Sequence, residues 1–280
     1  MSAKNYIVKV MIPCYNVEKY ISKCIDSVLK QNYNLKYVKI VCVDDGSTDN
    51  TLKILQEYKT RLGDNMELYT QKNKGLWTTR RNLLLDNKDC DYLVCLDGDD
   101  TWRKNFLKHC SEYFDNKPDV ICLKKIHWQK SSGIWMIYDI KFKPNLNDYK
   151  GNGSGMMWDK VWNANFLKKY VNLIPKCDAK QVRCDDAIMN LILNSFVKTV
   201  KINKHMDYNY FYRKSSLMHN KIQKFSCCSF EACKAAVELL NKSKEIVGEK
   251  FDIHIFKRWL SIFGGVGSSV NSNYKNIVNK

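Results

Sequence analysis

Five apolar residues and three carboxylates follow one another in Tyr92-Leu93-Val94-Cys95-Leu96-Asp97-Gly98-Asp99-Asp100. The apolar half predicts a buried β-strand. Carboxylates this close repel one another, which destabilises the fold unless a cation lies among them. Oxygen ligands suit Mg²⁺ or Mn²⁺, and these ions usually hold phosphates in their remaining coordination positions. The run therefore predicts a metal–diphosphate site at the carboxyl end of a sheet; the alternative is that Asp99 or Asp100 caps the next helix.

The residues before this run alternate between strand and helix patterns. Apolar runs predict strands at 8–12, 38–43, 66–71 and 92–96. Helical spacing predicts helices at 18–30, up to about Thr60 after a cap at Ser47 or Thr48, and at 75–86. This order is typical of an α/β fold with a mainly parallel sheet and right-handed crossovers.

Polar clusters follow three of the predicted strands. They are Pro13-Cys14-Tyr15-Asn16, Asp44-Asp45-Gly46-Ser47 and Asp97-Gly98-Asp99-Asp100. Ligands of parallel sheets bind beyond the carboxyl ends of the strands, which is where all three clusters fall. We therefore expect the clusters to form one site, although Asp44, Asp45 and Ser47 would equally suit a turn that caps a helix.

The second half of the chain is less regular. The pattern predicts helices at 105–114 and 187–193, and strands at 120–124, 135–140, 197–202 and 208–212. Residues 143–155 have loop composition, and helices are expected again at 230–247 and 255–263.

Composition indicates a folded protein without a membrane span. The chain has 280 residues, of which 45% are hydrophobic, enough for one large domain, or for one domain with an appendage. An apolar run at 7–12 is broken by Lys9 and is too short for a signal peptide. The 12 cysteines contain no C-x-x-C pair, which disfavours zinc and suits a reducing compartment. We expect a cytoplasmic protein.

The formal charge of +17 favours anionic partners such as nucleotide phosphates, nucleic acid, lipid headgroups or an acidic glycan. Because the lysines are spread along the whole chain, the simplest interpretation is a solvated basic surface. Peripheral contact with a membrane surface stays open.

Three motifs in this order resemble those of the inverting family-2 glycosyltransferases with the GT-A fold. They are Val10-Met11-Ile12-Pro13-Cys14-Tyr15-Asn16, Val43-Asp44-Asp45-Gly46-Ser47-Thr48-Asp49 and Leu96-Asp97-Gly98-Asp99-Asp100. The resemblance covers roughly residues 6 to 220. It implies a GT-A nucleotide-diphospho-sugar transferase fold, Rossmann-like with flanking helices. The implied domain spans 1–220, with a nucleotide-sugar-binding half at 1–104, an acceptor half at 105–220 and a helical C-terminal extension at 221–280.

The same resemblance assigns roles in binding the donor. Asp44 or Asp45 would accept a hydrogen bond from the uracil imide, and Asp97 would bind the ribose or water around the metal. Asp99 would ligate a divalent cation, Mn²⁺ or Mg²⁺, that neutralises the leaving diphosphate. The predicted metal ligands are Asp99, Asp97 and His219, and the predicted nucleotide-sugar-binding residues are Pro13, Tyr15, Asn16, Asp44, Asp45, Gly75, Arg80, Asp97, Gly98, Asp99, Lys160 and Arg213.

A further pair of carboxylates, Asp185 and Asp186, matches the position of the family's E-D motif, with Asp185 in place of Glu. In the family the second acid is the general base, so Asp186 is the predicted base and Asp185 the second candidate. The alternative is a pair of acids at a helix start. Trp102 is expected to pack under the site, and Trp162 is expected in the core.

The expected function is a metal-dependent inverting glycosyltransferase that moves a sugar from a nucleotide-diphospho-sugar, with uracil as the expected base. The acceptor would be a hydroxyl of a glycan, glycolipid or glycoprotein. One alternative is a sugar-nucleotide nucleotidyltransferase, which would need a Gly-rich phosphate loop where Pro13-Cys14-Tyr15-Asn16 stands. The other is a non-catalytic basic binding module, which leaves the three acidic strand ends unexplained; no nucleic acid is expected as a partner.

Overall fold

A single nine-stranded sheet organises the protein. The computed structural model describes residues 5–140, 156–177, 185–213, 235, 238–239 and 241–249. The strands are β1 (Val8–Cys14), β2 (Val38–Asp44), β3 (Met66–Thr70), β4 (Tyr92–Cys95), β5 (Thr101–Trp102), β6 (Val120–Gln129), β7 (Trp135–Asp139), β8 (Lys160–Asn163) and β9 (Val200–Tyr210). The strand order is β3-β2-β1-β4-β8-β6-β9-β5, with β7 paired to β6.

Helices flank this sheet. They are α1 (Ile21–Leu29), α2 (Thr51–Leu62), α3 (Leu76–Leu85), α4 (Phe106–Ser111), α6 (Ala164–Tyr170), α7 (Asp185–Asn194) and α9 (Ser243–Val247). Short 3₁₀ turns occur at Leu35–Tyr37, Gly63–Asn65, Phe114–Asn116 and Val171–Leu173. The α/β fold predicted from the sequence is confirmed.

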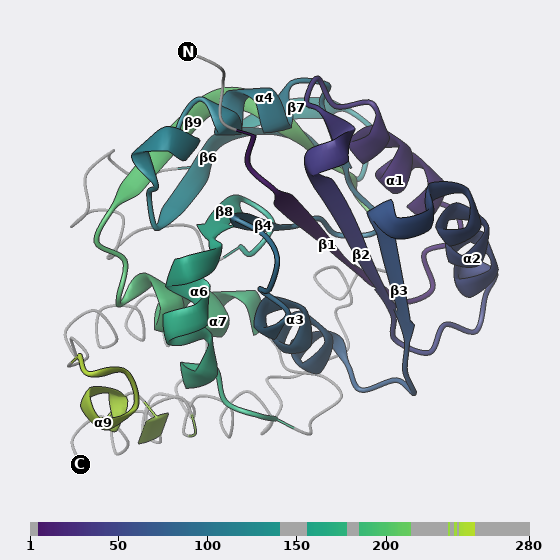
Figure 1. Ribbon diagram of the computed structural model, residues 1–280. Coiled ribbons are helices and arrows are strands. Elements are labelled where there is room, and N and C mark those ends of the chain that lie inside the picture. The colour runs from purple at the N-terminus through teal and green to yellow at the C-terminus, as the bar shows by residue number, and fades with distance from the viewer. Residues whose placement is uncertain are drawn as a thin grey trace.

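The first four strands are parallel, as the alternating pattern predicted. All seven residues of β1 and all four of β4 are buried, because both faces of this part of the sheet are covered. The chain moves from β1 through β2 to β3 and then returns across the sheet to β4. With right-handed crossovers, this reversal places α1 and α2 on one face and α3 on the other (Figure 1). A ligand crevice is expected at such a reversal, beyond the carboxyl ends of β1 and β4.

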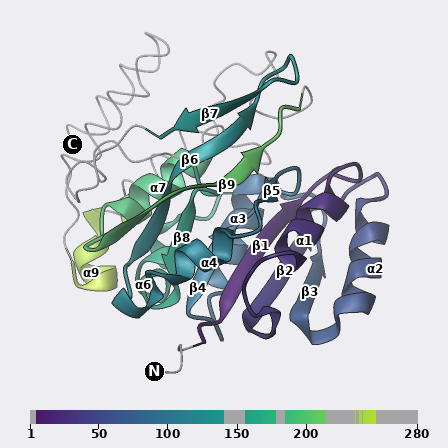
Figure 2. The same cartoon turned by 90° about the horizontal axis from the view of Figure 1, so that it is seen from above.

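The second half of the sheet mixes directions. β8 runs antiparallel to β4, β6 runs antiparallel to β8, and β9 runs parallel to β6. The carboxyl ends of β6 and β9 therefore point the same way as those of β1 and β4. Figure 2 shows β6 and β7 extending as a hairpin beyond the rest of the sheet.

Three expectations for the secondary structure are wrong in detail. The segments 197–202 and 208–212 belong to one long strand, β9, because pairing with β6 continues through an irregularity near Lys125. β8 and α6 were not predicted as elements. The helix α2 starts at Thr51 rather than after a Ser47 or Thr48 cap, and the Thr51 N–H instead donates to Asp49 Oδ1 at 2.9 Å. The predicted boundary near 220 lies outside the described residues.

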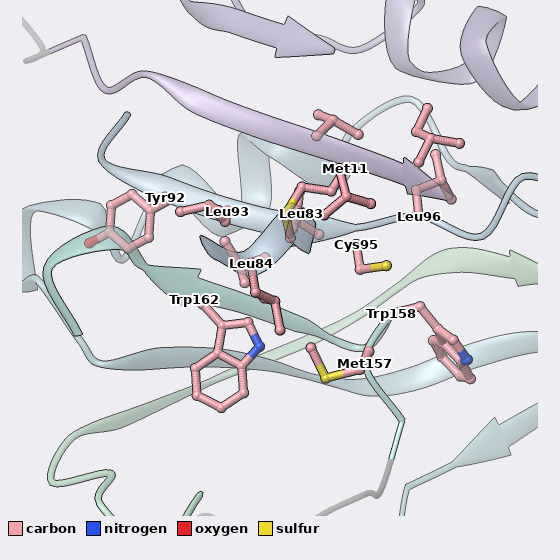
Figure 3. Packing of buried hydrophobic residues seen from close by; sticks show 14 of the residues in the cluster. Met11, Leu83, Leu84, Tyr92, Leu93, Cys95, Leu96, Met157, Trp158 and Trp162 are labelled. Carbon is pink, nitrogen blue, oxygen red and sulfur yellow. The ribbon is translucent and has the colours of Figure 1, made fainter. Parts of the chain in front are cut away.

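The core lies on both faces of the sheet and contains the two tryptophans that the pattern placed inside. Trp162 is fully buried, and Trp102 is buried and stacked on Phe106, with ring centroids 4.1 Å apart. Figure 3 draws members of this cluster from four elements, namely Met11 of β1, Leu83 and Leu84 of α3, Leu93 and Cys95 of β4, and Trp162 of β8. The helices in the described ranges include none with the length and apolar character needed to span a bilayer.

The loop after β2 requires glycine at position 46. Gly46 has φ +74°, and a Cβ there would lie 2.8 Å from the Asn73 backbone nitrogen. Gly248 also has φ +76° but has open space around it. The Gly46 position therefore combines an unfavourable backbone conformation with a backbone clash, whereas Gly248 has only the first.

We predict that Gly46→Ala lowers the free energy of unfolding by about 2–4 kcal/mol, while Gly248→Ala lowers it by about 1 kcal/mol. Urea unfolding followed by circular dichroism measures both. Equal losses in the two variants would contradict the close approach of the loops.

Candidate active site

The loops that follow β1 and β2 are joined into one unit by hydrogen bonds. The Asn16 N–H donates to Ser47 Oγ at 3.0 Å, and the Thr48 N–H donates to Asn16 Oδ1 at 2.8 Å. Asn16 has φ +51°, a left-handed conformation that asparagine adopts more readily than most residues. Asn16 is therefore occupied in fixing the loops to each other.

Asp44 and Asp45 are neighbours with different surroundings. Asp45 Oδ1 accepts from the Lys74 N–H and from Gln71 Nε2, both at 2.8 Å, and its Oδ2 accepts from the Gly75 N–H at 2.9 Å. Asp45 therefore anchors the loop that leads into α3. Its carboxylate is fully engaged within the protein.

Asp44 keeps a free acceptor. Its Oδ2 accepts from the Ser47 N–H at 3.2 Å, but its buried Oδ1 has no hydrogen-bond partner within the described chain. The Asp44 residue is 2% exposed, and an unpartnered carboxylate oxygen at that depth is costly. Of the two acids, Asp44 is the one able to receive a donor from a ligand.

The loop after β4 packs against the loop after β1. A Cβ at Gly98 would lie 3.3 Å from the Pro13 carbonyl oxygen and 3.3 Å from a Val17 methyl. Glycine thus permits the two loops to approach. The geometry brings the three polar clusters together, as their positions in the sequence predicted.

Arg80 of α3 bonds to three carboxylates. Its guanidinium donates to Asp97 Oδ1 at 2.6 Å, to Asp185 Oδ2 at 2.8 Å and to Asp186 Oδ1. The Arg80 side chain is only 5% exposed. Burial alone would lower the pKa of Arg80, but the charges of Asp97 and Asp185 more than offset this, so the pKa is raised. Arg80 therefore stays charged and links the β4 loop to the start of α7.

Asp186 faces this centre from the first turn of α7. Besides Arg80, its carboxylate accepts from the Met157 N–H, at 3.1 Å to Oδ2. Burial raises the pKa of the adjacent Asp185, Arg80 opposes that rise, and the Asp97 charge adds to it. Both predicted catalytic acids thus lie beside the predicted donor-binding residues Arg80 and Asp97.

The acids in the loop after β4 have different partners. Asp99 Oδ2 lies 2.9 Å from Arg213 Nε, and Arg213 also donates to the Asn16 carbonyl oxygen at 3.4 Å. Burial raises the pKa of Asp99, the Asp97 charge adds to the rise, and Arg213 opposes it. Asp97 and Asp99 are therefore two neighbouring carboxylates whose ionised forms are stabilised by a nearby positive charge.

Asp100 is structural. Its buried carboxylate accepts from the Tyr208 hydroxyl at 2.8 Å and from the Phe211 N–H at 2.9 Å, tying the end of β9 to the β4 loop. Sequence reasoning missed Tyr208 and Gln71, because their importance lies in contacts with Asp100 and Asp45 that are distant in sequence. The available signal for Gln71 was its closeness in the sequence to Gly75, a predicted nucleotide-sugar-binding residue.

Two of the three predicted metal ligands, Asp97 and Asp99, lie in this site. Within the described ranges, no three His, Cys, Asp or Glu side chains converge as a complete cage. Asp97 and Asp99 fit a divalent cation whose other positions are filled by diphosphate oxygens, because Mg²⁺ is commonly held by one or two carboxylates plus substrate phosphates. The third predicted ligand, His219, lies outside the described residues.

Two other predicted donor-binding residues differ in exposure. Lys160 is buried, and its ammonium donates to Asp159 Oδ1 at 2.6 Å and to the Met156 carbonyl oxygen at 2.7 Å. A buried ammonium needs internal partners of this kind, and the contact of Lys160 with the nucleotide-sugar stays a prediction. Tyr15 is 46% exposed on the loop after β1.

Comparisons with known proteins find similar sequences and folds. A family model described as "Glycosyl transferase family 2" matches residues 9–170. A poly(ribitol-phosphate) beta-glucosyltransferase of Bacillus spizizenii is 26% identical over 209 residues, which are 73% of this chain and 32% of the relative. Glycosyltransferase GlyA of Streptococcus pneumoniae is 26% identical over 83% of this chain and 34% of its own. The matched region thus spans about a third of each of these relatives.

Solved structures share the fold. Residues 1–349 of Staphylococcus aureus TarS, crystallised in complex with UDP-GlcNAc, superpose with a TM-score of 0.71 at 20% identity, covering 97% of this chain and 79% of that one. The mannosyltransferase PcManGT of Pyrobaculum calidifontis, in complex with GDP-Man and Mn²⁺, gives a TM-score of 0.54 at 13% identity, with 98% and 79% covered.

We predict that Arg80→Ala lowers the free energy of unfolding by about 3–5 kcal/mol at pH 7.5, because three part-buried carboxylates lose the buried guanidinium that neutralises them. Without Arg80 the pKa of Asp185 rises further, so the folded variant binds protons more readily than the unfolded chain does. The loss is therefore smaller at pH 5 than at pH 7.5. Urea unfolding of wild type and Arg80→Ala at both pH values measures the loss of unfolding free energy.

The matched control is Arg81→Ala, since Arg81 donates only to the Ile174 carbonyl oxygen, at 2.8 Å, in the described contacts. A loss of about 1 kcal/mol, independent of pH, is expected for this variant. A pH-independent loss in Arg80→Ala would contradict its role as the counter-charge.

Proposed function

The chain belongs to glycosyl transferase family 2, and on that premise we propose that it is a metal-dependent inverting glycosyltransferase using a UDP-sugar. The observation that carries the proposal is the unpartnered, buried Oδ1 of Asp44 at the carboxyl end of β2. An imide N–H of uracil is a donor that this oxygen can accept. The TarS structure in complex with UDP-GlcNAc supports a uridine nucleotide as the donor's leaving group.

Asp97 and Asp99 would hold Mg²⁺ or Mn²⁺ together with the diphosphate of the donor. When bound, the ion supplies Lewis-acid stabilisation of the charge that develops on the leaving nucleoside diphosphate. Arg80 and Arg213, which now contact Asp97 and Asp99, add fixed positive charge at the same place. These four side chains come from α3, the β4 loop and the residues after β9.

Asp186 is the proposed general base. The acceptor hydroxyl attacks the anomeric carbon, the new C–O bond forms as the bond to the diphosphate oxygen breaks, and the hydroxyl proton passes to Asp186. Direct displacement of this kind converts an α-linked donor into a β-linked product. The Met157 N–H and Arg80 hold the carboxylate in a fixed orientation, which favours proton transfer to one defined position.

The proposed acceptor is a hydroxyl of a glycan or glycoconjugate. The named activity of the Bacillus relative is on poly(ribitol-phosphate), a polyanion, and the formal charge of +17 suits an anionic acceptor. Peripheral attraction to an anionic membrane surface is compatible with the same charge. The nucleotidyltransferase alternative is less favoured, because the loop after β1 is fixed by Asn16 and is not Gly-rich.

We predict that Asp44→Asn weakens UDP binding about 10- to 100-fold, because an amide is a poorer partner for the uracil imide than a carboxylate. CDP binding should weaken less, since cytosine N3 carries no hydrogen. Isothermal titration calorimetry with both nucleotides measures the ratio. The exposed Asp64→Asn variant is the control, and an unchanged UDP-to-CDP ratio in Asp44→Asn would contradict the assignment.

Donor turnover should require a divalent ion and Asp99. We predict that UDP release from a panel of UDP-sugars, measured without acceptor, falls at least about 100-fold on chelation of the metal or in Asp99→Asn. Asp64→Asn again serves as the control. Full release with chelator present would contradict metal dependence and leave the family assignment intact.

A further inference from the structure

A row of aromatic rings leads away from Asp186. It begins at Trp158, the neighbour of Met157, whose N–H donates to the Asp186 carboxylate. The Trp158 ring lies 6.0 Å from the Tyr210 ring, and Tyr210 is stacked on Trp128 with centroids 4.3 Å apart. The ring centroid of Trp128 in turn lies 6.0 Å from that of Tyr138. We name Trp158, Tyr210, Trp128 and Tyr138 the aromatic row.

The register of the sheet puts three of these rings on one face. Trp128 pairs with Tyr210 of β9 and with Met136 of β7, and Tyr138 pairs with Ile126 two positions away on the same side. The other face of the hairpin carries a separate set of side chains, including Trp135, Ile137 and His127. The row therefore follows one side of β9, β6 and β7.

Exposure increases along the row. Trp158 is 3% exposed, Tyr210 and Trp128 are half-buried, and Tyr138 at the outer end is 53% exposed. Met136, beside it on the same face, is 44% exposed. The row thus runs from Trp158, which follows the Met157 that bonds to Asp186, to Tyr138 on the β6–β7 hairpin. Figure 2 shows this hairpin projecting from the sheet. β7 exposes large apolar side chains on both faces, since Ile137 on the other face is 61% exposed. The face of Met136 and Tyr138 differs in being continuous with Trp128 and Tyr210, and an exposed apolar surface of this kind marks a binding site.

We propose that the aromatic row is the acceptor subsite and that it holds a carbohydrate chain, with successive units lying against Tyr210, Trp128 and Tyr138, while the buried Trp158 supports the inner end of the row. The proposal rests on the proposed function, since it needs Asp186 as the base at which the chain ends. Continuity with Asp186 favours a chain of linked units over a membrane or a second protein copy. Aromatic faces pack against the C–H faces of sugars, and the tyrosine and tryptophan polar edges can bond to hydroxyls.

The test compares two faces of one strand. Tyr138→Ala and Met136→Ala remove the outer end of the aromatic row, while Ile137→Ala removes a side chain of 61% exposure from the opposite face of β7. Each protein, labelled with a fluorophore and saturated with UDP, is applied to a printed glycan array. Glycans that bind wild type are then titrated in solution. UDP affinity, measured by calorimetry, is a separate readout of the donor site.

We expect wild type to bind at least one oligosaccharide, with Kd raised more than about ten-fold in Tyr138→Ala and less than about two-fold in Ile137→Ala. UDP affinity should be unchanged in all three variants. The proposal is overturned if wild type binds no glycan, or if Tyr138→Ala and Ile137→Ala raise the glycan Kd equally. It is also overturned if the protein binds only phosphatidylglycerol vesicles and that binding depends on Tyr138. If wild type does not bind UDP, the proposed function is refuted instead, whatever the glycan array shows.

Discussion

The ion pairs of Arg80 are the interaction on which the rest of the site depends. One buried guanidinium neutralises Asp97 from the β4 loop together with Asp185 and Asp186 from α7. Without Arg80, the three part-buried carboxylates would repel one another and lose part of their hydration without compensation. Arg80 lies on α3, which connects β3 to β4 in the parallel half of the sheet, and this half supplies the donor loops. Its contact with Asp185 and Asp186 joins that half to α7, which supplies the candidate base.

Neighbouring acids in this site do different work. Asp45 and Asp100 are consumed by hydrogen bonds that hold loops and β9 in place, while Asp44, Asp97 and Asp99 retain capacity for a ligand. The structural acids make the functional ones possible, since a loop held by three bonds to Asp45 cannot rearrange without leaving that carboxylate unsatisfied. Preorganisation of this kind is what electrostatic catalysis requires.

Beyond the donor loops, the fold extends its sheet with β8, β6, β9 and β7, and this extension is where the molecule departs from a simple parallel pattern. The long pairing of β6 with β9 brings Tyr208 under Asp100 and Tyr210 against Trp128. One strand therefore both braces the donor loop and displays an aromatic surface to the outside.

Local patterns were enough for the parallel half of the fold. Apolar runs ending in Asn16, Asp44 and Asp97 identified strands whose polar ends must meet, because parallel strands share an edge. The resemblance of the same motifs to family 2 was confirmed by the family match. The choice between Asp44 and Asp45, the pairing of Arg80 with three acids and the burial of Lys160 were not readable from the chain. Those outcomes depend on which backbone N–H groups and charges arrive from distant segments. The continuity of β9 between its two predicted segments was not predicted for the same reason: it is imposed by pairing with β6, and pairing partners are decided only when the chain folds.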